Sequence, residues 1–168
     1  MIDSLAFLAS IDRIAIAKTR YRLVDMTFEL EVTFAEDDEP ASSRDSVLSD
    51  ASPSSYQVER SYSDLLELHQ AILNTARHSH THDAEECTYC SAFVNHCVML
   101  EENLPTRIGR LFVPTEMMHM MVEGMLAQIL SLIRSKLKWE SNTELCYGQR
   151  LLPVIFGRFL DQELFIED

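Results

Sequence analysis

Cysteine and histidine side chains gather near the middle of the chain, and their types suit metal binding. Cys87 and Cys90 form a Cys-x-x-Cys pair. This spacing is a common zinc half-site, because two thiolates placed two residues apart can bind one tetrahedral ion. His96 or Cys97 is a candidate third ligand, and one histidine among residues 78–82 is a candidate fourth. The spacing therefore allows a structural zinc site.

The same segment also fits a helix without any metal. Residues 90–100 read CSAFVNHCVML, and their small or apolar side chains recur at helical spacing. In that alternative the cysteines are buried core residues, the histidines of residues 78–82 lie in a solvated loop, and the chain requires no cofactor. Both interpretations stay open on the sequence alone.

A second group of residues lies where a strand is expected to run into a helix. Residues 56–73 read YQVERSYSDLLELHQAIL, with Arg60 and Tyr62 at the junction. A guanidinium can bind phosphate oxygens with two parallel hydrogen bonds, and an aromatic ring can pack on a sugar. The alternative is structural: Arg60 pairs with neighbouring acids, and Tyr62 caps the core with its hydroxyl outward.

The motifs of common enzymes are missing from the sequence. There is no glycine-rich phosphate loop, no nucleophile elbow and no distinctive pair of carboxylates, so an enzyme is not expected. Nucleic acid is not an expected partner either, because the net charge is −13 and there is no basic stripe. The excess acid falls in residues 36–54, 76–104 and 161–168. A local basic pocket on the remaining scaffold is therefore compatible with the charge.

The sequence also carries expectations about the compartment. No apolar run is long enough to span a bilayer, and the first residues lack the basic start of a signal peptide. Four cysteines without a secretory signal favour a reducing environment. We therefore expect a cytoplasmic protein.

Hydrophobic periodicity predicts three strands followed by helices. The strands are expected over residues 11–17, 23–34 and 55–61, with residues 18–22 as a hairpin turn. A first helix is expected to begin at Ser63 or Asp64, because either side chain can cap it. A long helix over residues 115–136 and a last segment over 143–160 follow, and Pro153 is expected to start a new helix or kink the old one.

This order predicts an α+β fold, with a three-stranded antiparallel β-sheet packed against a helical subdomain. We expect one domain over residues 1–168, with its core at about 11–160. An acidic, serine-rich insertion is expected at residues 36–54 and a His/Cys-rich insertion at 76–104.

The order of elements and one motif together resemble the PX (phox-homology) family. The motif is R-S-Y-S-D-L-x-x-L-H at residues 60–69, between the third strand and the first helix, and an L-P-T-R loop follows at 104–107. The resemblance covers roughly residues 11–160. It implies a module that binds phosphoinositides, with phosphatidylinositol 3-phosphate as the default ligand, and that is recruited to endosomal-type membranes as a peripheral protein.

The resemblance also implies roles for individual residues. The lipid-binding set is Arg60, Ser61, Tyr62 and Arg107, with Tyr62 packing on the inositol ring. The loop tip that enters the bilayer is represented by Leu111, Phe112 and Val113.

Two positions depart from the family pattern. Ser61 stands where the family has the arginine that holds the 3-phosphate, and residues 116–121, EMMHMM, lack the arginine of the long helix. These departures motivate the alternative function, a degenerate PX fold that acts in protein–protein interaction without binding lipid.

Overall fold

The structure is a computed structural model that describes residues 4–22, 25–35, 55–80, 87–106, 108–135 and 145–161. Nine elements follow one another along the chain, in the order α1 (Ser4–Ser10), β1 (Ile11–Arg22), β2 (Asp25–Phe34), β3 (Ser55–Ser61), α2 (Tyr62–Arg77), α3 (Thr88–Glu101), the 3₁₀ helix η1 (Gly109–Phe112), α4 (Thr115–Ser135) and α5 (Tyr147–Leu160). The predicted acidic insertion at residues 36–54 lies outside the described residues.

The three strands form one antiparallel sheet in the order β1-β2-β3. Alternate side chains of β2 point into the core, as the period of two in the sequence predicts; these are Met26, Phe28, Leu30 and Val32. The prediction of a turn at residues 18–22 is wrong, because these residues belong to β1 and pair with Asp25–Glu29. Pairing between β1 and β2 therefore continues to Arg22 and Asp25, beyond the alternating segment at residues 11–17.

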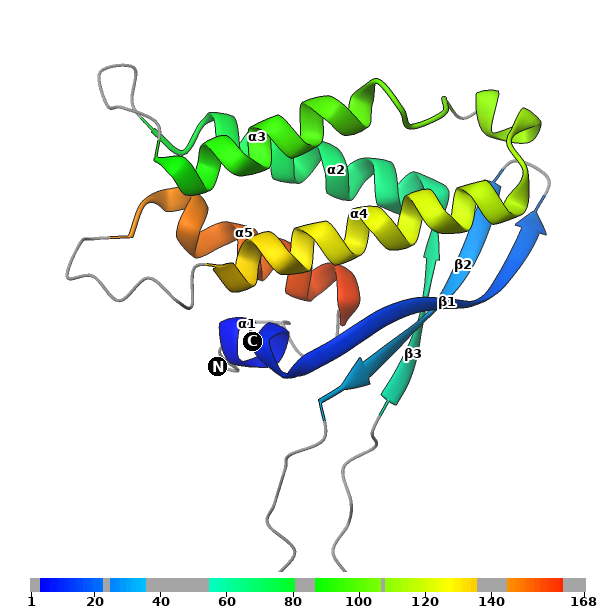
Figure 1. Cartoon of the computed structure of the whole chain (residues 1–168), viewed down its shortest axis with the longest axis horizontal. Coiled ribbons are helices and arrows are strands. Elements are labelled where there is room, and N and C mark those ends of the chain that lie inside the picture. Colours follow the sequence, from blue (N-terminus) through cyan, green and yellow to red (C-terminus); the bar gives the residue numbers. More distant parts are fainter. Residues whose placement is uncertain are drawn as a thin grey trace, which may run out of the picture.

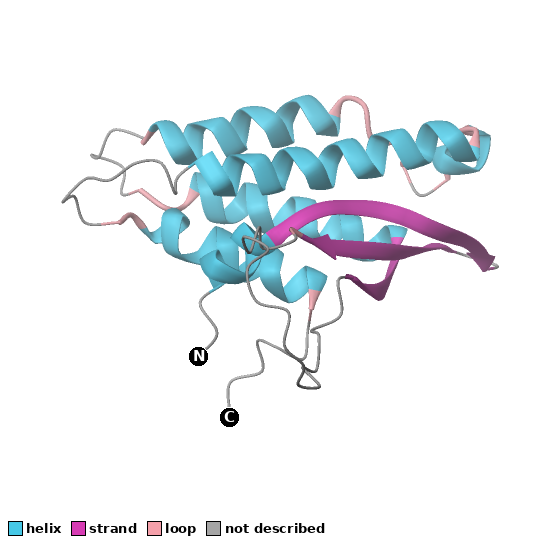
Figure 2. Cartoon of the chain, turned by 60° about the horizontal axis from the view of Figure 1, so that its bottom comes forward, coloured by secondary structure: helices cyan, strands magenta, loops and turns pink. Residues whose placement is uncertain are grey.

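The helices gather on one side of the sheet, which confirms the α+β class (Figures 1 and 2). α2 lies against β2 and β3, and α4 lies against β1. The apolar face predicted for α2 is buried, including Leu65, Leu68 and Ile72. α3 is a core helix, with Cys90, Phe93 and Cys97 buried, so most of the predicted His/Cys-rich insertion is an ordinary part of the domain.

One helical feature was not expected from the sequence, and another excludes one of the two alternatives expected for Pro153. α1 was not predicted, yet Phe7 and Leu8 are buried and α1 contacts α4 and α5, so the core begins before residue 11. Pro153 lies inside α5 and does not start a new helix. A proline in the middle of a helix leaves one backbone carbonyl without its usual partner.

The elements leave two ends of the molecule available for sites. At one end, η1 and the start of α4 lie beside the end of the β1–β2 hairpin (Figure 1). At the opposite end, the first turn of α5 lies beside the start of α3 and the last turn of α2 (Figure 1). The chemistry-bearing residues divide between these two ends.

Candidate functional site

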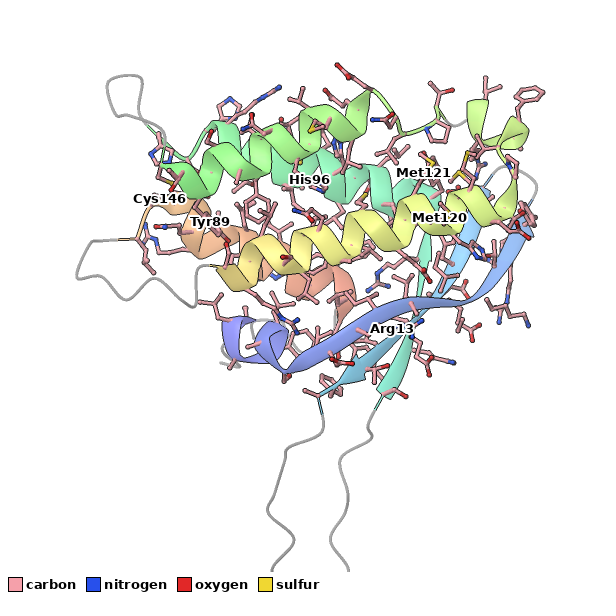
Figure 3. The ribbon with its side chains drawn as sticks, in the orientation of Figure 1. Arg13, Tyr89, His96, Met120, Met121 and Cys146 are labelled. Carbon is pink, nitrogen blue, oxygen red and sulfur yellow. The ribbon has the colours of Figure 1, made fainter. Side chains whose placement is uncertain are left out.

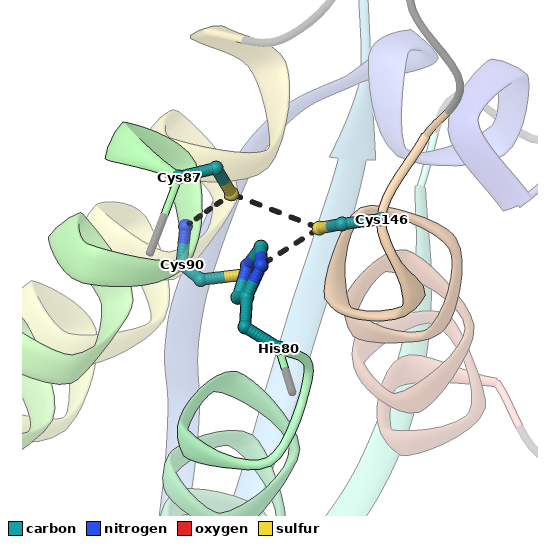
Figure 4. A group of neighbouring side chains, drawn as sticks. All are labelled: His80, Cys87, Cys90 and Cys146. Atoms are coloured by element: carbon teal, nitrogen blue, oxygen red, sulfur yellow. Dashed lines mark hydrogen bonds between the residues drawn. The ribbon is translucent and has the colours of Figure 1, made fainter. Parts of the chain in front are cut away.

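Four potential metal ligands converge at the end where α2, α3 and α5 meet. They are His80, Cys87, Cys90 and Cys146, and their ligand atoms all lie within 4.8 Å of one another (Figure 4). All four cysteines of the chain are free thiols. Three sulfur atoms and one imidazole nitrogen are a donor set that can hold a metal ion.

Three helix ends position these side chains. Cys87 is the N-cap of α3, and Cys90 lies in the first turn of the same helix. Cys146 is the N-cap of α5 and forms a capping box with Gln149. His80 follows the end of α2. The site therefore forms where two helix N-termini approach one helix C-terminus.

The sulfur atoms are in direct contact. The Sγ atom of Cys146 lies 3.7 Å from that of Cys87 and 3.6 Å from that of Cys90. Burial raises the pKa of Cys87, but hydrogen bonds from Cys90 and Cys146 lower it more, so the net shift is downward. The pKa of Cys90 is raised, because burial and its bonds to the other two thiols disfavour the thiolate.

The structure brings together part of the predicted metal set. Cys87 and Cys90 lie in the cluster, and His80 belongs to the predicted range of residues 78–82. His96 and Cys97 are not members of this group. Cys146, which was not predicted, takes the place of the third ligand.

His96 and Cys97 lie further along α3 and serve other contacts. Figure 3 shows His96 midway along the helical layer and Cys146 at its end. Burial and the nearby His69 lower the pKa of His96. His69 contacts the backbone carbonyl of Cys97 through Nε2 at 2.9 Å, and burial raises the pKa of the Cys97 thiol to about 11. Both residues are therefore part of the interior between α2 and α3.

At the strand–helix corner, where β3 runs into α2, the side chains predicted to bind lipid make contacts within the protein. Ser61 is the N-cap of α2: its Oγ accepts from the backbone N–H of Asp64 at 3.0 Å, and the Asp64 carboxylate accepts from the Ser61 N–H at 2.7 Å. This reciprocal pair is a capping box. The helix is thus capped by Ser61 and not by Ser63 or Asp64, and the serine of the motif has a local structural role.

Tyr62 and Arg60 also face the protein. Tyr62 is 0% exposed and its hydroxyl donates to the Pro105 carbonyl at 2.6 Å, so its ring cannot pack on an inositol in this conformation. The Nε atom of Arg60 donates to the Phe159 carbonyl at 2.6 Å, and its guanidinium lies over the Phe159 ring. The two residues bind the strand–helix corner to the loop that contains Pro105, which we call the 105 loop, and to the end of α5. The buried ring of Tyr62 therefore differs from the role expected for it.

Asp25 links the corner to η1. Its carboxylate accepts from the Ser63 hydroxyl at 2.6 Å and from the Arg110 guanidinium at 2.8 Å. Arg110 is 5% exposed and its guanidinium lies over the ring of Tyr62. Burial raises the pKa of Asp25, but the bonds from Ser63 and Met26 and the charge of Arg110 outweigh it, so the pKa lies below the ordinary 3.8.

Arg110 holds a strongly exposed apolar loop, which we call the tip and define as residues 108–113. Ile108 is 71% exposed, Leu111 70% and Phe112 82%, and Val113 is half-buried. Leu111 and Phe112 are therefore exposed to solvent, and the entry of this loop into a bilayer stays a prediction. Arg107 lies outside the described residues, so its predicted role remains a prediction.

A cavity of about 370 Å³ separates the tip from the end of the hairpin. Its lining includes Arg22, Asp25, Arg110 and Thr115, so it contains two guanidinium groups and one carboxylate. Arg22 is well exposed and lies 3.5 Å from Glu59, while Arg20 pairs with Glu29 and Glu59. Surface pairs of this kind are weak and can exchange partners.

Comparison with known proteins adds no relative. No protein-family model matches the chain, and no curated protein or solved structure matches it significantly.

Within the described residues, none of the helices has the length and apolar character needed to cross a bilayer. Function is therefore argued from the two sites themselves.

Gly148 allows the first turn of α5 to approach the cluster, which makes it a sensitive position. A Cβ atom there would lie 2.5 Å from the Ser79 Oγ and 2.6 Å from the Cys90 Sγ. We expect Gly148→Ala to destabilise the protein by roughly 1–3 kcal/mol, because a packed interior resists added volume. Urea unfolding monitored by circular dichroism measures this.

Gly124 provides the matched control, since a Cβ atom there meets nothing within 4 Å. Gly124→Ala should be neutral or stabilising by about 0.5–1 kcal/mol, the usual gain for alanine in an exposed helix interior. Equal destabilisation by both changes would contradict the close approach at Gly148.

Asn in place of Asp25 tests the network that holds the tip. Asp25→Asn removes the carboxylate charge that faces Arg110, and we expect a loss of roughly 2 kcal/mol at neutral pH, below the cost for a fully buried pair because Asp25 is partly exposed. The folded-state pKa is lowered, so the contribution of Asp25 is present above about pH 4 and disappears as the pH falls through the folded value.

The stability difference between the wild type and Asp25→Asn should therefore shrink as the pH is lowered from 7 to 3. Thermal unfolding across this range measures it, with Glu67→Gln on the exposed face of α2 as a control for the loss of one carboxylate. A difference that stays constant with pH would contradict the assignment.

Proposed function

We propose that this chain is a membrane-docking module that binds a phosphoinositide-bearing surface through the tip. The observation that carries the proposal is the exposure of Ile108, Leu111 and Phe112 on one short, anchored loop. Exposed apolar side chains that are grouped in this way mark a binding surface for a membrane or a protein. The PX resemblance favours the membrane and an endosomal-type location.

The tip is held in place before any binding occurs. Arg110 lies in η1 between the exposed side chains and the core, and it is fixed by Asp25 and by the ring of Tyr62. A loop that is already ordered loses less conformational entropy on docking than a free one. Burying Leu111 and Phe112 in a bilayer contributes on the order of 1.5–3 kcal/mol each.

The cavity beside the tip is the place we propose for the lipid headgroup. Its two guanidinium groups and one carboxylate leave one net positive charge in a chain of net charge −13. Arg22 is the exposed cation of this cavity, and the Thr115 hydroxyl lies at its edge. An anionic headgroup would replace Glu59 as the partner of Arg22, and phosphatidylinositol 3-phosphate is the first ligand to test.

Liposome flotation tests the proposal directly. We expect the wild type to float with vesicles that contain phosphatidylinositol 3-phosphate. Leu111→Ser/Phe112→Ser should reduce binding at least roughly tenfold, given the burial energy of two large apolar side chains. Arg22→Ala should reduce binding to phosphoinositide vesicles. Arg60→Ala and Arg107→Ala test the residues that the PX resemblance implies.

Met99→Ser is the matched control, because this methionine of α3 is 68% exposed and lies outside the tip. Its binding should equal that of the wild type. If folded wild-type protein floats with no vesicle of any phosphoinositide content, the membrane proposal is wrong. The tip would then be assigned to a protein partner.

We also propose that the cluster of His80, Cys87, Cys90 and Cys146 binds zinc. Three thiolates and one imidazole make a soft, four-donor set, and zinc takes four such ligands in a tetrahedron. The Nε2 atom of His80 supports the proposal, because it is buried without a hydrogen-bond partner among the described residues. A buried polar atom of this kind carries a desolvation cost that a bound ion removes.

Metal analysis of purified protein tests zinc binding. We expect about one zinc per chain in the wild type and a large loss in Cys146→Ser, since this change removes one of four ligands. Cys97→Ala is the control, because Cys97 lies outside the cluster. Full zinc content in Cys146→Ser together with a loss in Cys97→Ala would restore the ligand set predicted from the sequence and refute this one.

A further inference from the structure

We infer that the metal site is a closed structural cross-link that fastens the N-terminus of α5 to the ends of α2 and α3, so that the order of this end of the molecule depends on metal. The inference rests on the zinc binding proposed above and adds to it the coordination type and the role of the ion. It concerns the end of the molecule opposite the tip (Figures 1 and 4).

Two of the sulfur–sulfur distances match the edges of a tetrahedral zinc site. A zinc–sulfur bond of about 2.3 Å gives an edge of about 3.8 Å between two sulfur ligands in a tetrahedral site. The distances from the Cys146 Sγ to those of Cys87 and Cys90 are 3.7 and 3.6 Å. These two distances are therefore compatible with shared coordination of one zinc ion by the three thiolates.

The His80 imidazole supplies the fourth donor. Its ligand nitrogen lies within 4.8 Å of the three sulfur atoms, and its Nε2 atom is buried without a hydrogen-bond partner among the described residues. Neutral thiols in contact with one another would account for the sulfur distances alone. They would not account for the approach of an imidazole nitrogen to all three sulfur atoms.

Cysteine occupies two helix N-caps in this site. Serine, threonine, aspartate and asparagine are the preferred N-cap residues, whereas α3 begins with Cys87 and α5 with Cys146. The Cys87 Sγ accepts from the Cys90 N–H at 3.5 Å, and the Cys146 Sγ accepts from the Gln149 N–H at 3.4 Å. Helix N-termini favour negative charge, so both sulfur atoms are placed where thiolate ligands are stabilised.

Four protein donors are the number that a closed tetrahedral zinc site requires. A zinc site that carries out catalysis keeps one position for water or substrate, whereas a structural site is closed by protein ligands. The cluster belongs to the second type, and its role is mechanical. The ion would join His80, Cys87 and Cys90 to Cys146, which lies far from them in the sequence. Cross-links that close long loops are expected to stabilise a fold most.

Apart from Gly148, which packs against Ser79 and Cys90, the first turn of α5 has little buried attachment. Leu145 is 47% exposed and Tyr147 is 53% exposed, so the residues on both sides of Cys146 contribute little to the core. The buried side chains of α5 that anchor it are in its later turns, from Leu152 onward. We therefore expect metal loss to release the first turn of α5 while the later turns remain packed.

Titration of metal-free protein with zinc is the test, with three readouts. Zinc should raise the melting temperature by roughly 10 °C, as expected for a tightly bound structural ligand in a chain of this size. Amide hydrogen exchange at residues 147–150 should slow at least roughly tenfold. Cobalt(II), which adopts the same geometry, should give the thiolate charge-transfer and tetrahedral visible bands of a closed sulfur-rich site.

Three variants make the experiment decisive. Cys146→Ser should lose the zinc-induced rise and the protection of residues 147–150. His80→Ala should lose most of the rise; it removes a ring whose Nε2 is unsatisfied, and so should leave the metal-free fold intact. Cys97→Ala should keep the full rise, because Cys97 lies outside the cluster. Any effect of this change on the metal-free protein cancels, because the rise on adding zinc is measured within each variant.

The outcomes separate the two proposals. Zinc binding with a sulfur-rich cobalt spectrum, but without protection of residues 147–150 or with a full rise in Cys146→Ser, would overturn the cross-link and leave zinc binding intact. Absence of stoichiometric zinc or cobalt binding in folded protein would overturn both.

Discussion

The pairing of the Asp25 carboxylate with Arg110 is the interaction on which the end of the molecule that carries the tip depends. The carboxylate stands at the start of β2 and binds Ser63 in the first turn of α2 and Arg110 in η1. Arg110 in turn covers the ring of Tyr62, whose hydroxyl holds the 105 loop. One charged group thus fixes the relative positions of the sheet, a helix and the tip. A buried guanidinium needs such a partner, because an unpaired charge in the interior is costly.

The side chains of the strand–helix corner, to which the PX resemblance gives a role in lipid binding, make structural contacts within the domain. Ser61 caps α2, Arg60 binds the end of α5, and Tyr62 fills the core. These side chains are used by the fold, and the surface that remains for a membrane is the tip with its neighbouring cavity.

At the opposite end, where α2, α3 and α5 meet, the contacts are between cysteine sulfur atoms and not between charged side chains. Helix N-termini that would ordinarily be capped by hydroxyl or carboxylate oxygens are capped there by Cys87 and Cys146. The close approach needs a residue without a side chain, which Gly148 provides. In our proposals, a metal stabilises this end and a lipid surface engages the other, so the two functions are separated by the length of the helical layer.

The sequence by itself determined the element types and much of the local chemistry. Alternation in β2, the apolar face of α2 and the pair Cys87 and Cys90 all follow from spacing within a few residues, where the periods of strand and helix decide the outcome. The tertiary structure alone decided that Cys146 joins that pair, that Tyr62 turns inward and that Arg110 meets Asp25. These contacts join residues far apart in the chain. They depend on how whole helices pack, and no local period encodes that.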